Sequence, residues 1–443
     1  MKNKFCVIFL LVGSLFFGHA SAQTKKWTLQ ECVEYALKNN ISVRQSELDL
    51  KLSEIDKKAA FGSFLPTANM SANHSWNVGL NQNPVTGINQ ILTTANTTFN
   101  ASVQADIYKG MQNQLRFQRS KMAIISSQYQ LQKMQDDISL NVANAYLQIL
   151  FNRENLKVQQ QQLQTDLKQS ERSAQLLEGG LIPRGDLLDI NATVELDRQK
   201  VIQAENQLLI SRLSLAQLLQ LDDFQTFDVA DEAYDKENSK VLLETPKAIF
   251  EKAKTTRSEI KIAQANLDLA EADVKIARRG YQPTLGAFYN FNTRATSAAP
   301  DPFWSQIDDY KGHTYGFQLN IPIFNGFTTK NAVERNKVAF DRSKLTFDQQ
   351  NLDLERNVYT AFTDAQGALK AYDAAVSADE ARAEALVYAK ERYEVGLINV
   401  FDLNQAQTLS VNAQSEVLRT KYDFIFKVKI LEFYFGIPIY QKQ

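Results

Sequence analysis

Residues 314–326 read TYGFQLNIPIFNG, and most of this stretch alternates between apolar and polar or small side chains. A period of two residues indicates a β-strand with one apolar and one polar face. The alternation predicts a strand that runs as far as Ile323. Its apolar face would carry Tyr315, Phe317, Leu319, Ile321 and Ile323.

Three other segments alternate in the same way and begin near residues 68, 98 and 285. Their polar faces are rich in amides, their apolar faces include Trp76 and Tyr289, and Phe288 is an exception to the pattern. Polar residues facing a water-filled interior and aromatic residues facing lipid are typical of transmembrane β-barrel strands. Each segment has about ten residues, which is the length that a tilted transmembrane strand needs.

Four strands cannot close a barrel, and an open sheet edge in lipid leaves backbone groups without hydrogen bonds. The sequence therefore predicts that other copies of the chain supply the missing strands. Two copies would give a small barrel whose interior is filled with side chains, whereas three would give a twelve-stranded barrel. Because the interior of the smaller barrel is filled, a role as a conduit favours three copies.

The chain is an internal duplication. Pro66 in the first half matches Pro283 in the second, and farther along the register slips once by a single position, so that Ile107 matches Ile323 and Gly110 matches Gly326. The period is far too long for a solenoid repeat, so one fold unit is used twice. The predicted organisation is a first repeat at 23–221, an acidic connector at 222–245 that folds against the outside of the helices, and a second repeat at 246–443.

Each repeat predicts the same series of elements. A helix of moderate length comes first (29–64 and 246–281), followed by two strands, a long helix (113–178 and 328–395) and a returning helix (185–221 and 400–435). The reversal between the last two helices reads EGGLIPRGDLL at 178–188 and YEVGLINVFDL at 393–403. At a rise of 1.5 Å per residue, the long helices would reach on the order of 100 Å, more than an ordinary globular domain can hold.

Residues 1–22 are expected to be a signal peptide. Lys2 and Lys4 precede an apolar stretch at 5–17, and Ala20-Ser21-Ala22 provides the small residues of a cleavage site, so the mature chain would begin at Gln23. Cleavage removes two of the 49 basic residues and none of the 50 acidic ones. The nearly neutral balance argues against a nucleic-acid-binding protein. Cys32 would then be the single cysteine, so no intramolecular disulfide is possible.

The duplicated layout, the paired reversals and the segment IPIFNG at 321–326 together resemble the TolC family of outer membrane efflux proteins. The resemblance covers the whole mature chain, although the first repeat has the weaker version ADIYKG at 105–110. It implies a mainly α-helical fold with a transmembrane β-barrel, in which a homotrimer forms a twelve-stranded barrel in the outer membrane of a Gram-negative bacterium and an α-helical tunnel through the periplasm.

The resemblance also implies a passive exit duct for a tripartite efflux pump or a type I secretion system. The partners would be a periplasmic adaptor protein and an inner-membrane transporter, either proton-driven or of the ABC type. The sequence does not indicate the cargo.

In this family, rings of aspartate narrow the duct at its periplasmic tip. The resemblance places Asp402 and Gln405 at that constriction, with Asp186 and Asp189 as the pair in the first repeat. Tyr393 matches a tyrosine of the network that closes the tip, and its alternative is a core tyrosine. Asp186 and Asp402 could instead cap the helices that begin there, or interact with their positive ends.

The family's adaptor docks at the hairpin tips, which here are Gly180, Leu181, Ile182, Gly396, Leu397 and Ile398. The two glycines could also serve simply as helix stops that accept positive φ.

No convergent set of polar residues suggests an enzyme, and no cofactor is expected. The mature chain has two histidines, His74 and His313, without metal-ligand spacing, and the loop at 301–311 has three acidic residues that could bind a cation. The alternative function is a periplasmic coiled-coil adaptor or scaffold without a channel. Long helices suit that alternative, but four strands with amide-rich faces do not.

Overall fold

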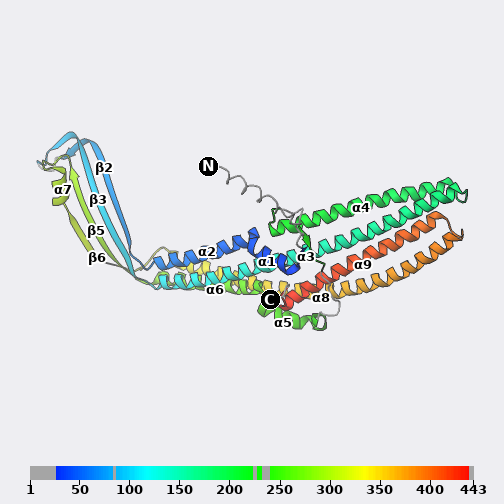
Figure 1. The fold of residues 1–443 in the computed structure, drawn as a ribbon. Helices are drawn as coiled ribbons and strands as arrows, with labels where there is room; N and C mark the ends of the chain where they lie inside the picture. Colours follow the sequence, from blue (N-terminus) through cyan, green and yellow to red (C-terminus); the bar gives the residue numbers. More distant parts are fainter. Residues whose placement is uncertain (1–25, 83–85, 223–226, 232–239, 439–443) are drawn as a thin grey trace, which may run out of the picture. The chain divides into compact units, whose positions relative to one another are not determined.

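The structure is a computed structural model that describes residues 26–82, 86–222, 227–231 and 240–438 (Figure 1). The expected signal peptide and Gln23 lie outside the described residues. The chain divides into two compact units. Unit 1 comprises residues 1–44, 135–253 and 356–443, and unit 2 comprises residues 45–134 and 254–355, so each unit takes segments from both sequence repeats.

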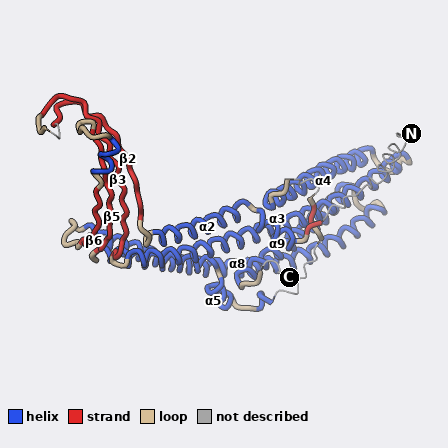
Figure 2. The backbone as a smooth tube through the Cα atoms, turned by 60° about the vertical axis from the view of Figure 1, so that its left-hand side comes forward, coloured by secondary structure: helices blue, strands red, loops and turns tan. Residues whose placement is uncertain are grey.

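Unit 2 contains a four-stranded antiparallel sheet, whose strands are drawn in red in Figure 2. Its strands lie in the order β2 (Thr67–Gln82), β3 (Asn89–Lys109), β5 (Thr284–Thr296) and β6 (Gly312–Asn320). All four are strands that alternation predicted. With 16 and 21 residues, β2 and β3 are longer than the expected ten.

The register aligns apolar side chains in some rows and polar side chains in the adjacent rows, across the whole sheet. One row pairs Ala68, Val103, Tyr289 and Tyr315, and the adjacent row on the opposite face pairs Asn69, Ser102, Asn290 and Thr314. Directly opposite residues in an antiparallel pair point to the same face, so the apolar and amide-rich faces are continuous over the four strands.

Phe288 breaks the alternation because it lies on the polar face, and the register explains how the sheet accommodates it. Phe288 is paired with Gly316. A Cβ at Gly316 would lie 3.2 Å from the Phe288 ring, so the missing side chain leaves room for the ring.

The last strand is shorter than predicted. Alternation predicted a strand as far as Ile323, but β6 ends at Asn320. Pro322 has no backbone N–H to donate to a strand ladder, which is why alternating side chains there do not form a strand. The equivalent segment in the first repeat has no proline, and β3 continues to Lys109.

The long helices repeat with identical spacing. α3 (Gln112–Glu178) and α8 (Thr328–Glu394) have 67 residues each, and α4 (Arg184–Leu219) and α9 (Val400–Phe435) have 36 each. The bounds of α8 and α9 are shifted from those of α3 and α4 by the same distance along the chain that separates Gly110 from Gly326. This match confirms the predicted duplication.

The first helix of each repeat is divided, contrary to the prediction of one helix. The first repeat has α1 (Leu29–Asn39) and α2 (Ile41–Gly62). The second has α5 (Pro246–Thr256) and α6 (Ser258–Arg278), followed by a short 3₁₀ turn at Arg279–Tyr281. The breaks fall at the equivalent positions Asn40 and Arg257, both extended in backbone conformation.

The break at Asn40 has a local cause. Its side-chain amide donates to the Leu218 carbonyl at 2.9 Å, and its Oδ1 accepts from the Ser42 amide at 2.9 Å. Asparagine side chains often replace backbone hydrogen bonds in this way, which ends one helix and caps the next.

The described part of the acidic connector binds to α3 in unit 1. Its strand β4 (Asp228–Val229) pairs in parallel with β1 (Lys26–Trp27). Arg153 on α3 donates to Asp228 at 2.6 Å and also pairs with Asp231. The fully buried Tyr146 donates its hydroxyl to the Ala230 carbonyl at 2.7 Å.

Two short helices complete the structure, at Lys240–Leu243 and at α7 (Phe303–Asp309). The second lies within the segment 301–311 that the sequence suggested was a loop. Of the helices described, none is long and apolar enough to cross a membrane.

Tyr146→Phe is expected to lower the free energy of unfolding by about 1–2 kcal/mol, because the half-buried carbonyl of Ala230 loses the hydroxyl of the fully buried Tyr146 as its donor. The measurement is a guanidinium unfolding curve of the full chain in detergent. Tyr359→Phe is the control, since the Tyr359 side chain is 44% exposed and its change should stay within about 0.5 kcal/mol. Equal effects of the two substitutions would contradict the prediction.

Candidate functional site

The helix α3 ends at a glycine turn. The Gly180 amide donates to the Leu177 carbonyl and the Leu181 amide to the Leu176 carbonyl, both at 2.9 Å. The same two bonds recur at the equivalent positions around Gly396, at the end of α8. The two glycines have φ of +68° and +75°, values that a residue with a Cβ rarely adopts. Both therefore act as helix stops, and their docking role stays a prediction.

The side chains after these glycines are apolar and exposed. Leu181 is 73% exposed and Leu397 is 69% exposed, while Ile182 and Ile398 are half-buried. A Cβ added at either glycine would meet no atom within 4 Å, so the backbone of each tip is open to solvent. Both tips thus offer an exposed leucine beside an accessible backbone.

The alternative that Asp186 and Asp402 cap the helices that begin there is wrong. The N-cap of α9 is Asn399, whose Oδ1 accepts from the amide of Asp402 at 2.9 Å. The N-cap of α4 is Pro183, which makes no side-chain cap, and Asp186 lies in the first turn. Asp402 and Asp186 can still interact favourably with the helix ends, because both lie in the first turn, where the helix dipole gives a partial positive charge.

Asp402 and Gln405 are both exposed and lie three residues apart, on a face of α9 away from its buried residues Leu403 and Gln407. Their counterparts on α4 differ from each other, since Asp189 is exposed and Asp186 is half-buried. Asp402 and Gln405 are thus equally available to line an opening, and Asp186 is less so.

Tyr393 lies in the last turn of α8. It is half-buried, and its hydroxyl is buried without a hydrogen-bond partner among the described residues. The next residue, Glu394, accepts from Arg172 at 3.0 Å and so links the end of α8 to α3. No sequence signal predicted this ion pair, because its members lie 222 residues apart and at non-equivalent positions of the two repeats.

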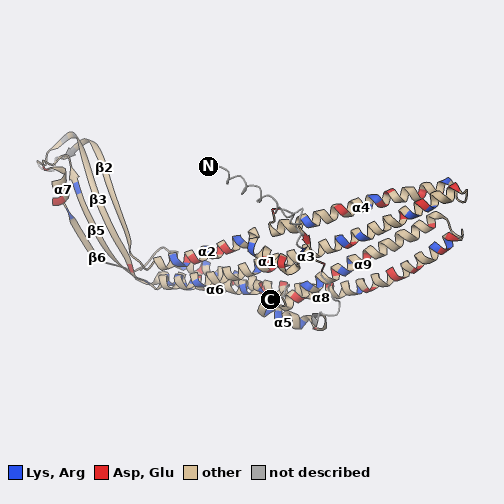
Figure 3. Cartoon of the chain, in the orientation of Figure 1, with Lys and Arg blue, Asp and Glu red and all other residues tan. Residues whose placement is uncertain are grey.

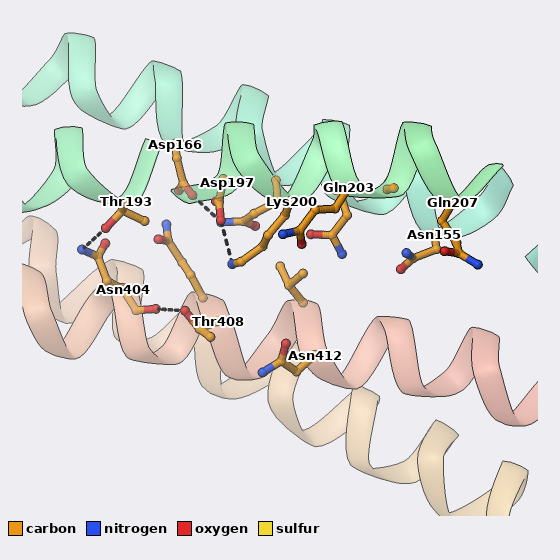
Figure 4. A pocket seen from close by; sticks show the side chains of 15 residues that line it. Asn155, Asp166, Thr193, Asp197, Lys200, Gln203, Gln207, Asn404, Thr408 and Asn412 are labelled. Atoms are coloured by element: carbon orange, nitrogen blue, oxygen red, sulfur yellow. Dashed lines mark hydrogen bonds and ion pairs between the residues drawn. The ribbon is translucent and has the colours of Figure 1, made fainter. Parts of the chain in front are cut away.

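A polar cavity of about 350 Å³ lies farther along the hairpins, between α3, α4 and α9 (Figure 4). Uncharged amides and hydroxyls dominate its lining. A hydrogen bond from Asn404 to Thr193, of 3.3 Å, joins α9 to α4 at its edge. Sequence analysis missed this cavity, because polar residues on long helices usually indicate a solvated face.

Two aspartates lie side by side in the cavity. Asp166 on α3 and Asp197 on α4 point toward each other and share a side-chain hydrogen bond, and Lys200 reaches Asp197 at 2.8 Å (Figure 4). Asp166 and Asp197 are only 2% and 4% exposed. Burial is the main cause that raises the pKa of Asp166 to about 7, and the hydrogen bond to Asp197 is the next cause.

Charged residues are distributed unevenly between helices and strands. Figure 3 shows acidic and basic residues along all the long helices and few on the four strands. The polar face of the sheet therefore consists mainly of amides and hydroxyls. In the described part of the chain, no group of three or more His, Cys, Asp or Glu residues is arranged to hold a metal ion.

The sequence profile of the outer membrane efflux protein family matches the chain at residues 32–220 and 249–433. Outer membrane protein TolC of Vibrio cholerae is 24% identical over 303 residues, and the alignment spans 66% of each protein, just under two thirds of the relative's length.

Solved structures with the same fold include three outer membrane proteins. The CmeC outer membrane channel of Campylobacter jejuni has a TM-score of 0.77 at 17% identity, with 92% of this chain and 85% of that chain covered. VceC of Vibrio cholerae has a TM-score of 0.75 at 16% identity, with 92% and 96% covered. The MtrE outer membrane channel of Neisseria gonorrhoeae has a TM-score of 0.69 at 18% identity, with 92% and 88% covered.

At these identities the structural matches establish the fold, and they confirm the predicted class of a mainly helical, duplicated chain with few strands. The profile match covers far more than half of the chain and repeats along it, as the duplication does. The chain therefore belongs to the outer membrane efflux protein family, a family of channel proteins located in the outer membrane.

Proposed function

We propose that three copies of this chain form a passive exit duct in the outer membrane, with a gate at the hairpin tips of unit 1. The observation that carries the proposal is the two-faced sheet of unit 2. Its amide-rich face suits a water-filled passage, and its apolar face suits lipid. Cargo would move through such a duct passively, without a reaction that involves residues of the chain.

The exposure of the apolar face supports contact with lipid. Trp76, Tyr315 and Phe317 are 67%, 80% and 74% exposed. An apolar surface of this kind on a protein in water marks a contact with a partner or a membrane. Aromatic residues are also enriched where a membrane protein meets the lipid–water interface.

The edges of the sheet support assembly. β2 and β6 stand at the two ends of the strand order, and among the described residues each pairs on one side only. Lipid offers no hydrogen bonds to an open edge, so strands of neighbouring copies would have to pair with them. Three copies with four strands each would close a twelve-stranded barrel, which leaves more interior space than two copies would.

The tips of unit 1 are the proposed gate and docking surface. The Arg172–Glu394 ion pair ties the first hairpin to the second near these tips. Separation of the hairpins would widen the opening and would break this pair. Asp402 and Gln405 would line the opening, and the exposed Leu181 and Leu397 would contact a periplasmic adaptor that connects to an inner-membrane transporter.

The duct proposal is tested by fractionating cells that produce the full chain and by gel analysis of the extracted protein without boiling. A trimer in the outer membrane fraction is expected, together with ion conductance after insertion into a planar lipid bilayer. A soluble monomer would contradict the duct and would favour the alternative of a periplasmic coiled-coil scaffold.

Asp402→Ala is expected to weaken block of the channel by divalent cations by at least about five-fold, since each copy loses a charge worth about 1 kcal/mol near a bound ion in water. Single-channel recording with cations added on the tip side measures this. Gln405→Ala is the matched control, because it removes an exposed neighbour one turn away without changing charge. Unchanged block in Asp402→Ala would exclude Asp402 from the constriction.

Arg172→Gln is expected to raise the fraction of time that the channel is open by up to about five-fold. Both partners of the Arg172–Glu394 pair are more than half exposed, and exposed pairs contribute at most about 1 kcal/mol. The control is Arg198→Gln, which removes an exposed ion pair with Glu195 inside α4. If both variants open the channel equally, the link between hairpins is not part of the gate.

A further inference from the structure

The first hairpin, formed by α3 and α4, contains a pair of buried carboxyl groups that the second hairpin lacks. Asp166 and Asp197 are joined by a side-chain hydrogen bond. The equivalent positions in the second repeat are Arg382 and Ala413. Because α8 and α9 form a hairpin with the same helix lengths without this pair, the pair is not needed to build such a hairpin.

A hydrogen bond between two carboxyl groups requires a proton on one of them. An ionised carboxylate only accepts hydrogen bonds, so it cannot donate to a second carboxylate. Two ionised carboxylates this close would also repel each other, and burial makes both charges more costly. At 2% and 4% exposure, Asp166 and Asp197 have little water to offset either cost. The geometry therefore calls for one shared proton.

The charged groups around the pair favour Asp166 as the holder of that proton. Lys200 on α4 lies 2.8 Å from Asp197 and compensates the charge of Asp197 directly. On α3, the neighbour of Asp166 is the neutral Gln162, whose amide donates to Asp166 at 2.7 Å. This bond lowers the pKa of Asp166, but by less than burial raises it. The residues of α9 that line the cavity are all uncharged: Asn404, Gln407, Thr408, Val411 and Asn412.

The cavity also contains an unpaired acceptor. Gln407 on α9 is only 3% exposed, and its Oε1 has no hydrogen-bond partner among the described residues. An additional acceptor cannot stabilise a second ionised carboxylate. The cavity thus supplies one cation, Lys200, for two aspartates, and a proton completes the balance of charge.

We propose that Asp166 and Asp197 bind one proton and form a clamp that holds α3 to α4 in the first hairpin. Loss of the proton near neutral pH loosens the first hairpin around these two residues, while the second hairpin has no such pair to lose a proton. The clamp lies within unit 1 and does not depend on the assembly or conductance proposed above.

The direction of the pH dependence follows from linkage. Burial holds the pKa of Asp166 at about 7 in the folded chain, above the value of 3.8 for a free aspartate. The protonated pair stabilises the folded chain fully below about pH 4, and this stabilisation is lost as the pH rises through about 7. The first hairpin should therefore be held more firmly at pH 5.5 than at pH 8.

The first test is infrared spectroscopy of the full chain in detergent. The C=O stretching band of a protonated carboxylic acid is expected to persist at pH 6 and to disappear with a midpoint near pH 7. Asp166→Asn should abolish this titration, and Asp348→Asn, at an exposed position on α8, should leave it unchanged. Absence of the band at pH 6, or its persistence in Asp166→Asn, would overturn the proposal.

Lys200→Gln provides a variant whose effect has a predicted sign. Lys200 lowers the pKa of Asp166 by its charge, so its neutralisation should move the midpoint upward. The Lys200 side chain is 46% exposed, so the substitution should not prevent folding. A midpoint that stays the same or moves down would show that the titrating group is not beside Lys200.

The clamp itself is tested by hydrogen exchange, corrected for the intrinsic pH dependence of exchange. Protection of peptides that contain residues 162–170 and 193–203 is expected to fall several-fold between pH 6 and pH 8. The equivalent peptide of α9, at 409–419, should show no such change. In Asp166→Asn, whose amide can donate permanently to Asp197, protection should be independent of pH. An equal pH response in the peptide 409–419, or a response retained in Asp166→Asn, would refute the clamp.

Discussion

The backbone pairing of β3 with β5 is the constraint on which the rest of the structure depends. Among the described residues it is the sheet contact that joins the two sequence repeats, and its register runs from Asn96 opposite Thr296 to Lys109 opposite Thr284. A slip of one residue would place Asn290 in the apolar row and Tyr289 in the polar row. One register therefore gives the sheet both of its continuous faces, on which a lipid-facing and a water-facing role depend.

Duplication gives the two repeats the same backbone but not the same chemistry. The helices of both hairpins have matching lengths, and both tips end in a glycine at positive φ. The residues after the glycines differ: Pro183 leaves the start of α4 without a side-chain cap, whereas Asn399 caps α9. The buried aspartate pair is likewise confined to the first hairpin. Two similar hairpins can thus differ in the roles proposed for them in docking, in gating and in the response to pH.

Most of the fold could be predicted because its signals are local and periodic. Alternation identified all four strands, and the paired reversals located the ends of the long helices to within one or two residues. The two wrongly predicted ends also have local causes, which the pattern of alternating side chains does not reveal. Pro322 removes a donor and ends β6, and the side chain of Asn40 competes with the helix backbone and divides the first helix.

The candidate site was predicted only in part. The glycine turns and the exposed aspartate at the second tip were visible in the sequence, because helix stops and first-turn acids have recognisable positions. The Arg172–Glu394 pair and the polar cavity were not visible, because they join helices that are distant in the chain. Side-chain contacts between such helices depend on the rotation of each helix about its axis, which the order of residues does not reveal.

The sequence by itself determined the duplication, the two-faced strands, the hairpin reversals and the family, since each follows from residue order and spacing. Only the tertiary structure decided which polar residues face solvent and which are buried together. Asp166 and Asp402 are both aspartates on long, polar helices, yet one is buried against a second carboxyl group and the other is exposed. The cost of burying a charge depends on its surroundings, and those surroundings are assembled from three helices rather than from one.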